Sequence, residues 1–250
     1  MITTTQRPAS TTSHEAGSDD ALPPLGTDSI YRRVLGTDFE RLHPMVQRRF
    51  GFCAADGIAS IGEGVMDEVW RGPAYTLSFL WLGTTRRILF PERGRDVPFA
   101  IRNYAYVDAL GRETMTWLRT FRIAGKTRHF DAYMVPGRGG IVDYLGTHQH
   151  LAVDIEVSVD ERGGIRLRSG PQRFHEGPAS FAFPMLASGT AEVREWWDER
   201  EGRFRISVDV RNRATGPLFG YRGGFRARWI RVAPGEIPAD ALPKRVERRE

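Results

Sequence analysis

The sequence predicts an α+β fold that is mostly β: a strongly curved antiparallel sheet or barrel-like cup of about nine strands, with N-terminal helices and one long helix packed on or in it. Three observations predict this fold. Apolar and polar residues alternate with period two from residue 97 onward, short glycine turns separate the alternating segments, and segments with helical spacing come near the start. Because short turns join strands that run in opposite directions, neighbouring strands should be antiparallel.

The helices are expected in the first 90 residues. Ser29 can cap a helix over residues 30–35, and Pro44 suits the first turn of a second helix that ends at Gly51. Residues 73–89 then carry apolar side chains at helical spacing, which predicts a long buried helix.

The strands follow from the period-two pattern. Residues 150–160 alternate most regularly, so that one face is buried and the other is wet or lines a pocket. An apolar insertion at 181–186 is interpreted as a short helix. In the last strand, Tyr221, Phe225 and Trp229 share one face, opposite a face of arginines. Strands are expected at 61–70, 97–107, 113–123, 127–135, 150–160, 165–168, 192–198, 204–211 and 221–232.

Composition limits the number of domains and the partners. A chain of 250 residues can bury one sizeable core, so residues 29–232 are expected to form one domain between a disordered leader at 1–28 and a Pro-rich charged tail at 233–250. The net charge of +5 is modest, and basic residues are interleaved with acidic ones, which argues against nucleic-acid binding. The single cysteine, Cys53, excludes an intrachain disulfide and suits a cytoplasmic location.

Three groups of residues carry a family resemblance. They are IYRRVLGTDF at 30–39 with LHP at 42–44, ETMTWLRTF at 113–121, and GYRG at 220–223. Read together, they resemble the bacterial domain-of-unknown-function family 4166 over about Ser29 to Val232. The resemblance implies stand-alone proteins or C-terminal modules behind a saccharopine-dehydrogenase-like nucleotide-binding domain, and therefore a partner of that kind. It implies no catalytic residue. Asp143 departs from the pattern, because a Glu is expected there.

The sharpest candidate for chemistry is a group of histidines. His148 and His150 are predicted to lie on one face of a strand, and a hairpin at 136–140 would place His129 and Asp131 on the facing strand. Imidazole and carboxylate groups bind zinc or non-haem iron, which makes His129, His148 and His150 candidate metal ligands. The same four residues are candidates for acid–base catalysis. The alternative is that both histidines of the His-x-His pair lie on a solvated strand face.

Aromatic residues offer a second kind of site. A cavity for a hydrophobic ligand is usually apolar with a few polar anchors, and Tyr75, Trp81, Tyr104, Tyr106 and Trp117 are candidates to line one. The alternative is an ordinary aromatic-rich core. The helix expected at 73–89 carries arginines at and beyond its end, so contact with an anionic membrane surface stays open as a further alternative.

These patterns leave three functions open. The leading hypothesis is a binding module that holds a hydrophobic or amphipathic small molecule in the concavity of the sheet. The second is an enzyme, such as a cyclase, an isomerase or a metal-assisted catalyst, that uses the His/Asp cluster. The third is an accessory domain of a nucleotide-dependent redox enzyme. Motifs for phosphate or dinucleotide binding are absent from the sequence, which therefore implies no particular cofactor.

Overall fold

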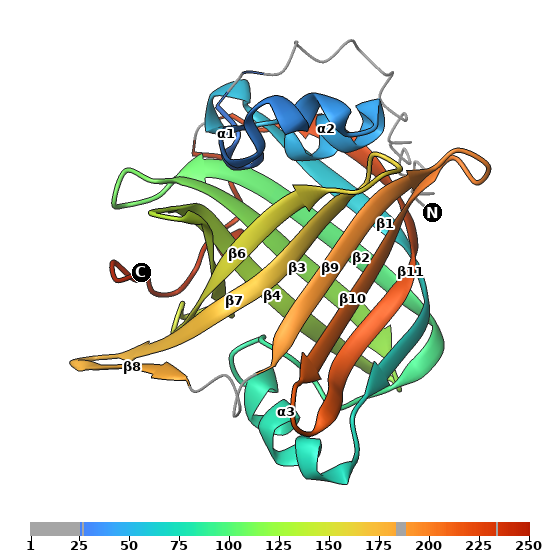
Figure 1. Ribbon diagram of the computed structural model, residues 1–250, viewed down its shortest axis with the longest axis vertical. Coiled ribbons are helices and arrows are strands. Elements are labelled where there is room, and N and C mark those ends of the chain that lie inside the picture. Colours follow the sequence, from blue (N-terminus) through green and yellow to red (C-terminus); the bar gives the residue numbers. More distant parts are fainter. Residues whose placement is uncertain (1–25, 27, 184–188, 234) are drawn as a thin grey trace, which may run out of the picture.

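A computed structural model describes residues 26, 28–183, 189–233 and 235–250 of the protein. Its main feature is a single antiparallel sheet of eleven strands (Figure 1). The strands are β1 (Ile58–Arg71), β2 (Gly94–Val107), β3 (Glu113–Ile123), β4 (Lys126–Gly137), β5 (Gly140–Leu145), β6 (Leu151–Val159), β7 (Ile165–Glu176), β8 (Ala179–Phe183), β9 (Thr190–Asp198), β10 (Arg203–Asn212) and β11 (Gly216–Arg231).

Ten of these strands close into a barrel. β1 pairs with β2 on one side and with β11 on the other, while β6 pairs with β7, so that the sheet returns on itself. β7 then pairs with β9 over its first residues and with β8 over its last ones. β8 lies outside the closed barrel and extends away from it with the end of β7 (Figure 1). The mainly β, strongly curved antiparallel architecture that the sequence predicts is confirmed.

Two strands were not expected from the sequence. β5 lies at residues 140–145, where no strand is expected from the sequence, and it pairs with both β4 and β6. The expected helix at 181–186 is wrong for residues 181–183, which belong to β8, and residues 184–188 lie outside the described part of the chain. A β-hairpin across Gly177 explains β8, because that glycine has a φ of 52°.

Helices cover the two ends of the barrel (Figure 1). α1 and α2 lie at one end, and α3 lies at the other. Ser29 caps α1 by accepting a hydrogen bond from the backbone N–H of Arg32, and Pro44 occupies the first turn of α2, as expected. The helices are α1 (Ile30–Leu35), α2 (Pro44–Phe50) and α3 (Leu77–Thr84), and the 3-10 turns are η1 (Gly36–Arg41), η2 (Ala54–Asp56), η3 (Ala74–Thr76) and η4 (Ala239–Ala241).

α3 is shorter and more exposed than the long buried helix expected at 73–89. The chain turns back after it, because the N–H of Ile88 donates to the carbonyl of Gly83 at 2.9 Å, and Arg87 adopts a left-handed φ of 57°. Leu80 is fully buried, whereas Trp81 and Leu82 are 48% and 69% exposed. The helix therefore closes one end of the barrel with one side and shows apolar residues to solvent with the other.

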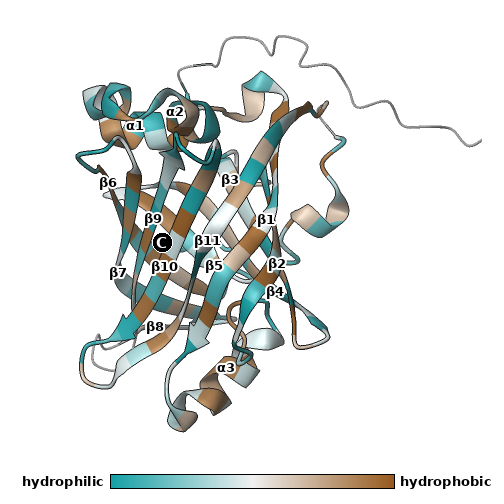
Figure 2. Ribbon diagram, turned by 90° about the vertical axis from the view of Figure 1, so that its right-hand side faces the viewer, coloured by the Kyte–Doolittle hydropathy of each residue, from teal (hydrophilic) through white to brown (hydrophobic). Residues whose placement is uncertain are grey.

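The strand alternation creates an interior core and a smaller exterior one, and Figure 2 shows hydrophobic and hydrophilic positions alternating along the strands. Interior positions of β11 confirm the predicted aromatic face for Tyr221 and Phe225, both buried, while Arg222 points out. Outside, Tyr133 and Tyr144 are buried in a second apolar cluster. Ala241 of the C-terminal residues belongs to that cluster.

The residues at 235–250, which we call the C-terminal segment, pack against the barrel wall. The backbone N–H of Lys244 donates to the carbonyl of Thr147, and the hydroxyl of Tyr144 donates to the carbonyl of Arg249, each at 2.7 Å. Glu247 is 4% exposed and binds Arg245 and Arg249. The expected Pro-rich charged tail is thus attached to the fold, while the expected leader at 1–28 falls almost wholly outside the described residues.

Candidate binding site

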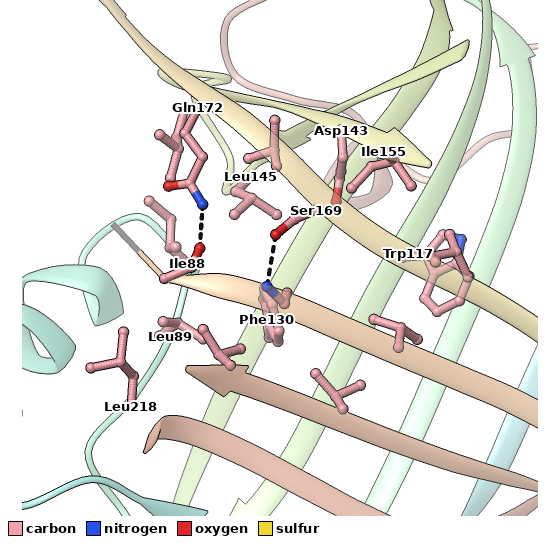
Figure 3. A pocket seen from close by; sticks show the side chains of 18 of the residues that line it. Ile88, Leu89, Trp117, Phe130, Asp143, Leu145, Ile155, Ser169, Gln172 and Leu218 are labelled. Atoms are coloured by element: carbon pink, nitrogen blue, oxygen red, sulfur yellow. Dashed lines mark hydrogen bonds between the residues drawn. The ribbon is translucent and has the colours of Figure 1, made fainter. Parts of the chain in front are cut away.

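A cavity of about 90 Å³ lies inside the barrel, in the half nearer to α3 (Figure 3). Its wall is mostly aliphatic and aromatic, and Phe79 of α3, which is 51% exposed, also contributes to it. The cavity wall therefore reaches the molecular surface at α3. The interior lining comprises Ile88, Leu89, Trp117, Arg119, Phe130, Met134, Asp143, Leu145, Leu151, Val153, Ile155, Leu167, Ser169, Gln172, Gly189, Ala191, Val193, Val208, Val210 and Leu218.

Three ionisable residues point into the barrel from strands whose other inward-facing residues near them are apolar. Arg119 lies between Trp117 and Phe121 on β3, Asp143 lies between Ile141 and Leu145 on β5, and Glu195 follows Val193 on β9. All three are buried, with Arg119 3% and Asp143 6% exposed. Charged residues are almost never fully buried unless they are paired, so these positions require an explanation.

The Arg119 guanidinium lies at the wall of the cavity. Its Nε donates to the carbonyl oxygen of Phe130 at 2.9 Å, and Nη1 donates to the hydroxyl of Tyr221 at 3.4 Å. The guanidinium carbon lies 3.7 Å from the centre of the Phe130 ring, which stabilises the cation by a cation–π interaction. Nη2 is buried and has no hydrogen-bond partner in the described part of the chain.

Asp143 faces the same cavity from β5 (Figure 3). Its Oδ1 is buried, and none of the described residues forms a hydrogen bond with it. Burial raises the pKa of the Asp143 carboxyl to about 7, although the Arg119 charge and a backbone hydrogen bond from Tyr133 oppose the rise. A substantial fraction of this carboxyl is therefore protonated near neutral pH, and the protonated form can donate a hydrogen bond.

Arg119 and Asp143 do not neutralise each other directly, since no ion pair within 4.0 Å joins them. The interior pair nearer to α2 behaves differently. There Arg49 of α2 reaches into the barrel and forms an ion pair with Glu195, and its Nη1 donates to Ser60 at 2.8 Å. The barrel thus holds one neutralised pair at the α2 end and two separate ionisable groups at the cavity.

The remaining polar groups at the cavity have partners. Ser169 accepts from the backbone N–H of Ala191 at 2.7 Å, and Gln172 donates to the carbonyl of Gly189 (Figure 3). Nε1 of Trp117 donates to the hydroxyl of Tyr31 at 2.8 Å. Among the described cavity residues, the buried side-chain atoms without a partner are therefore Nη2 of Arg119 and Oδ1 of Asp143.

The structure brings His148 and His150 together, but outside the barrel. The expected strand does not include them, because Gln149 has a left-handed φ of 53° and β6 begins only at Leu151. Their rings stack with centroids 5.5 Å apart. Nδ1 of His150 lies 2.9 Å from both Glu176 and Arg245, which holds it under the C-terminal segment.

His129 and Asp131 lie on the outer face of β4, opposite in direction to the interior Phe130. His129 contacts Thr120 at 3.3 Å, and Asp131 pairs with Arg87 at 3.2 Å. Burial lowers the pKa of His129 and raises that of Asp131. In the part of the chain that the structure describes, no group of three or more His, Cys, Asp or Glu residues could hold a metal ion. The metal and catalytic roles of these residues stay predictions.

Of the five aromatic residues expected to line a ligand cavity, the structure places only Trp117 in it. Tyr104 and Tyr106 occupy outward positions of β2, because the inward positions are those of Phe99 and Ile101. Tyr75 and Trp81 lie near or on α3, about half exposed. Side chains alternate between the two faces of a strand, so the tyrosines of β2 point to the outside of the barrel and away from the cavity.

The sequence analysis did not identify the interior ionisable residues, although the alternation of residues along β3 indicates one of them. Met115, Trp117, Arg119, Phe121 and Ile123 recur at every second position, and the arginine interrupts an otherwise apolar series. An arginine on the apolar face of a predicted strand indicates a buried charge, and a buried charge indicates a partner or a ligand.

The geometry defines the class of protein: a closed antiparallel β-barrel with an apolar interior cavity and ionisable groups in its wall, an architecture compatible with small-molecule binding. Comparison with known proteins places it more narrowly. The chain belongs to the family described as "Domain of unknown function (DUF4166)", whose model matches residues 42–225. This confirms the resemblance inferred from the sequence motifs.

One curated relative is similar to this chain over nearly all of its own sequence. The "Uncharacterized protein YndH" of Bacillus subtilis (strain 168) is 34% identical over 203 residues, which cover 79% of this chain and 96% of that protein. No solved structure matches the chain. Among the described residues, none of the helices has the length and apolar character needed to cross a membrane.

Proposed function

We propose that the protein binds a hydrophobic or amphipathic small molecule inside the barrel. The observation that carries this function is the apolar cavity itself, which adjoins two buried polar atoms that have no partner among the residues the structure describes. Protein interiors are otherwise packed with few voids larger than a water molecule. Transfer of an apolar ligand from water into such a space is favourable by roughly 25 cal/mol for each Å² buried.

The size of the cavity limits the ligand. A drug-sized molecule occupies pockets of about 300–1,000 Å³, whereas an engineered apolar cavity of about 150 Å³ holds benzene. At about 90 Å³ the interior space suits a compact molecule or a short alkyl chain. Hexan-1-ol is therefore a suitable neutral probe.

Entry to the cavity is expected from the α3 end. Phe79 lines the cavity and is also half exposed, whereas the opposite end is filled by α1 and α2 residues such as Tyr31 and Phe50, both buried. The exposed apolar side of α3 lies at the same end. A ligand that enters beside Phe79 meets Leu89 and Leu218 before it reaches Arg119 and Asp143.

The first test uses a substitution that fills the cavity with a larger side chain. Val153→Phe places a ring at an interior position of β6, so hexan-1-ol should bind at least about tenfold more weakly to the variant, because a lost buried contact of ~1.4 kcal/mol corresponds to a factor of ten. Isothermal titration calorimetry gives the affinities. The matched control is Val65→Phe, at a position of β1 that is 39% exposed, which should leave binding unchanged.

Circular dichroism checks that both variants fold, since a larger side chain in a packed core costs about 1–3 kcal/mol. Ala191→Val, which adds two methyl groups at another position of the same cavity wall, provides a second variant and should also weaken binding. Equal affinities for the wild type and both cavity variants would place the bound alcohol elsewhere and contradict the proposed function.

A further inference from the structure

We propose that the ligand is an amphipathic monocarboxylic acid whose carboxylate binds to Arg119 and Asp143 while its apolar chain fills the rest of the barrel cavity. This inference rests on the proposed function and adds the chemical class of the ligand. It follows from the charges inside the barrel, from the two buried atoms without partners, and from the apolar remainder of the cavity wall.

The charge balance inside the barrel favours an anion. Arg49 and Glu195 form an ion pair at the α2 end, which leaves Arg119 as a buried guanidinium with no carboxylate of the described residues within 4.0 Å. An unpaired charge in a protein interior is strongly destabilising, because it has lost its hydration without gaining a counter-charge. The aromatic ring of Phe130 and the hydroxyl of Tyr221 stabilise the cation only in part. A bound anion would complete the pair.

The donor geometry favours a carboxylate of single charge. One guanidinium nitrogen, Nη2 of Arg119, is free to donate, while Nε and Nη1 are already used. A phosphate would bring up to two negative charges and three acceptor oxygens to a wall that offers one unpaired cation. A monoanion neutralises that cation without leaving a further buried charge.

Asp143 supplies the second contact. Its Oδ1 is buried, unpartnered and part of the same cavity wall. In the protonated state the carboxyl donates a hydrogen bond to an acceptor oxygen, and O–H to O⁻ bonds are among the short, strong ones. The raised pKa, about 7, supports this role because it keeps the proton on Asp143 below neutral pH.

The charged and titratable groups that face Asp143 are few. The Arg119 charge on β3 lowers the pKa of the Asp143 carboxyl, and a charge on Asp143 in turn contributes to the raised pKa of the buried Tyr31 hydroxyl of α1. Above pH 7 an ionised Asp143 repels the carboxylate of the ligand and competes for Arg119. Binding of a carboxylate should therefore be stronger at pH 6 than at pH 8.5.

The rest of the wall suits an alkyl chain. Val153 lies opposite Asp143 on the neighbouring strand, and Leu145 and Leu167 line the same cavity, with Leu89 and Leu218 towards α3. The site thus has a polar end formed by two ionisable groups and an apolar end formed by aliphatic side chains. Such a division matches a ligand with one charged head and one hydrophobic body.

The test compares two probes of the same chain length, hexanoate and hexan-1-ol, at pH 6. Hexanoate should bind wild type at least about tenfold more tightly, because a hydrogen bond to a charged group contributes roughly 1.5–3 kcal/mol. Arg119→Gln should abolish this preference while hexan-1-ol still binds, and Arg119→Lys should keep part of it. The control is Arg222→Gln, an arginine of β11 whose side chain is 62% exposed.

The pH series gives a second readout. Hexanoate should lose affinity between pH 6 and pH 8.5 in the wild type, whereas Asp143→Asn should flatten the profile. If hexan-1-ol binds and hexanoate is not preferred, or if the preference survives Arg119→Gln, the carboxylic-acid inference is wrong and the proposed function stands. If neither probe binds, the proposed function fails and the inference fails with it.

Discussion

Glu195→Gln should lower the free energy of unfolding by about 3–5 kcal/mol, because it leaves a buried guanidinium without its counter-charge. Arg49 and Glu195 are 3% and 0% exposed, and Glu195 supplies the carboxylate of the pair. Among the described residues, Arg49 also contacts the hydroxyl of Ser60 and the rings of Phe50, Phe204 and Phe225, none of which carries a charge. Since whole domains are stable by about 5–15 kcal/mol, a loss of this size is readily measured.

Urea denaturation of wild type and variant at pH 7 gives the difference. Removing both partners, with Arg49→Met in the same chain, should recover more than half of the lost stability, because no charge is then left buried. Asp67→Asn is the control: it breaks the exposed pair with Arg205 and should cost less than about 1 kcal/mol. A loss for Glu195→Gln no larger than that of the control would show that the interior pair does not stabilise the fold.

Asp143→Asn should remove a pH dependence of stability that amounts to as much as about 4 kcal/mol between pH 4 and pH 8. Burial raises the pKa of this carboxyl from 3.8 to about 7 in the folded protein. The folded state therefore holds the proton more tightly than the unfolded state. Its contribution is fully present below pH 3.8 and is lost as the pH rises through 7, at ~1.4 kcal/mol for each pH unit.

The measurement is a set of denaturation curves for both proteins at pH 4, 6 and 8. The stability of Asp143→Asn relative to wild type should increase steadily over this range, because the amide cannot ionise. Asp154→Asn, on the outer side of β6 beside Arg173, should show no such increase. A constant difference between Asp143→Asn and wild type would mean that the buried carboxyl does not change its protonation on folding.

The sequence predicts most strands because each has a full period-two pattern, yet closure of the barrel is not visible in it. Closure depends on the pairing of β1 with β11, whose residues lie more than 140 positions apart. β5 was overlooked because it has six residues and carries Asp143 at an interior position. The buried aspartate interrupts the apolar face by which a strand is recognised.

The helix expected at 73–89 shows a different limit of prediction from the sequence. Apolar residues at helical spacing predict a helix that is buried, but Trp81 and Leu82 are exposed at the end of the barrel. The helical spacing of apolar residues does not predict the left-handed conformation of Arg87, which prevents the helix from continuing to Ile88. Local sequence thus predicts the presence of α3, whereas its length and place depend on tertiary contacts.

The candidate site could be predicted only in part. The His148–His150 pair attracted attention because histidines at close spacing are typical of metal sites, but the C-terminal segment and Glu176 supply their contacts outside the barrel. Trp117 was identified as a cavity residue from its aromatic character. Arg119 and Asp143 interrupt the apolar series of β3 and β5, but only closure of the barrel brings these inward-facing side chains to one cavity.

The most direct test is a crystal structure of the protein with 6-bromohexanoate, in which anomalous scattering locates the bromine. The account predicts bromine inside the barrel among the aliphatic side chains towards α3, such as Leu89 and Leu218, with the carboxylate within hydrogen-bond distance of Nη2 of Arg119. Bromine on the exposed side of α3, or a barrel that stays empty at saturating ligand, would contradict it.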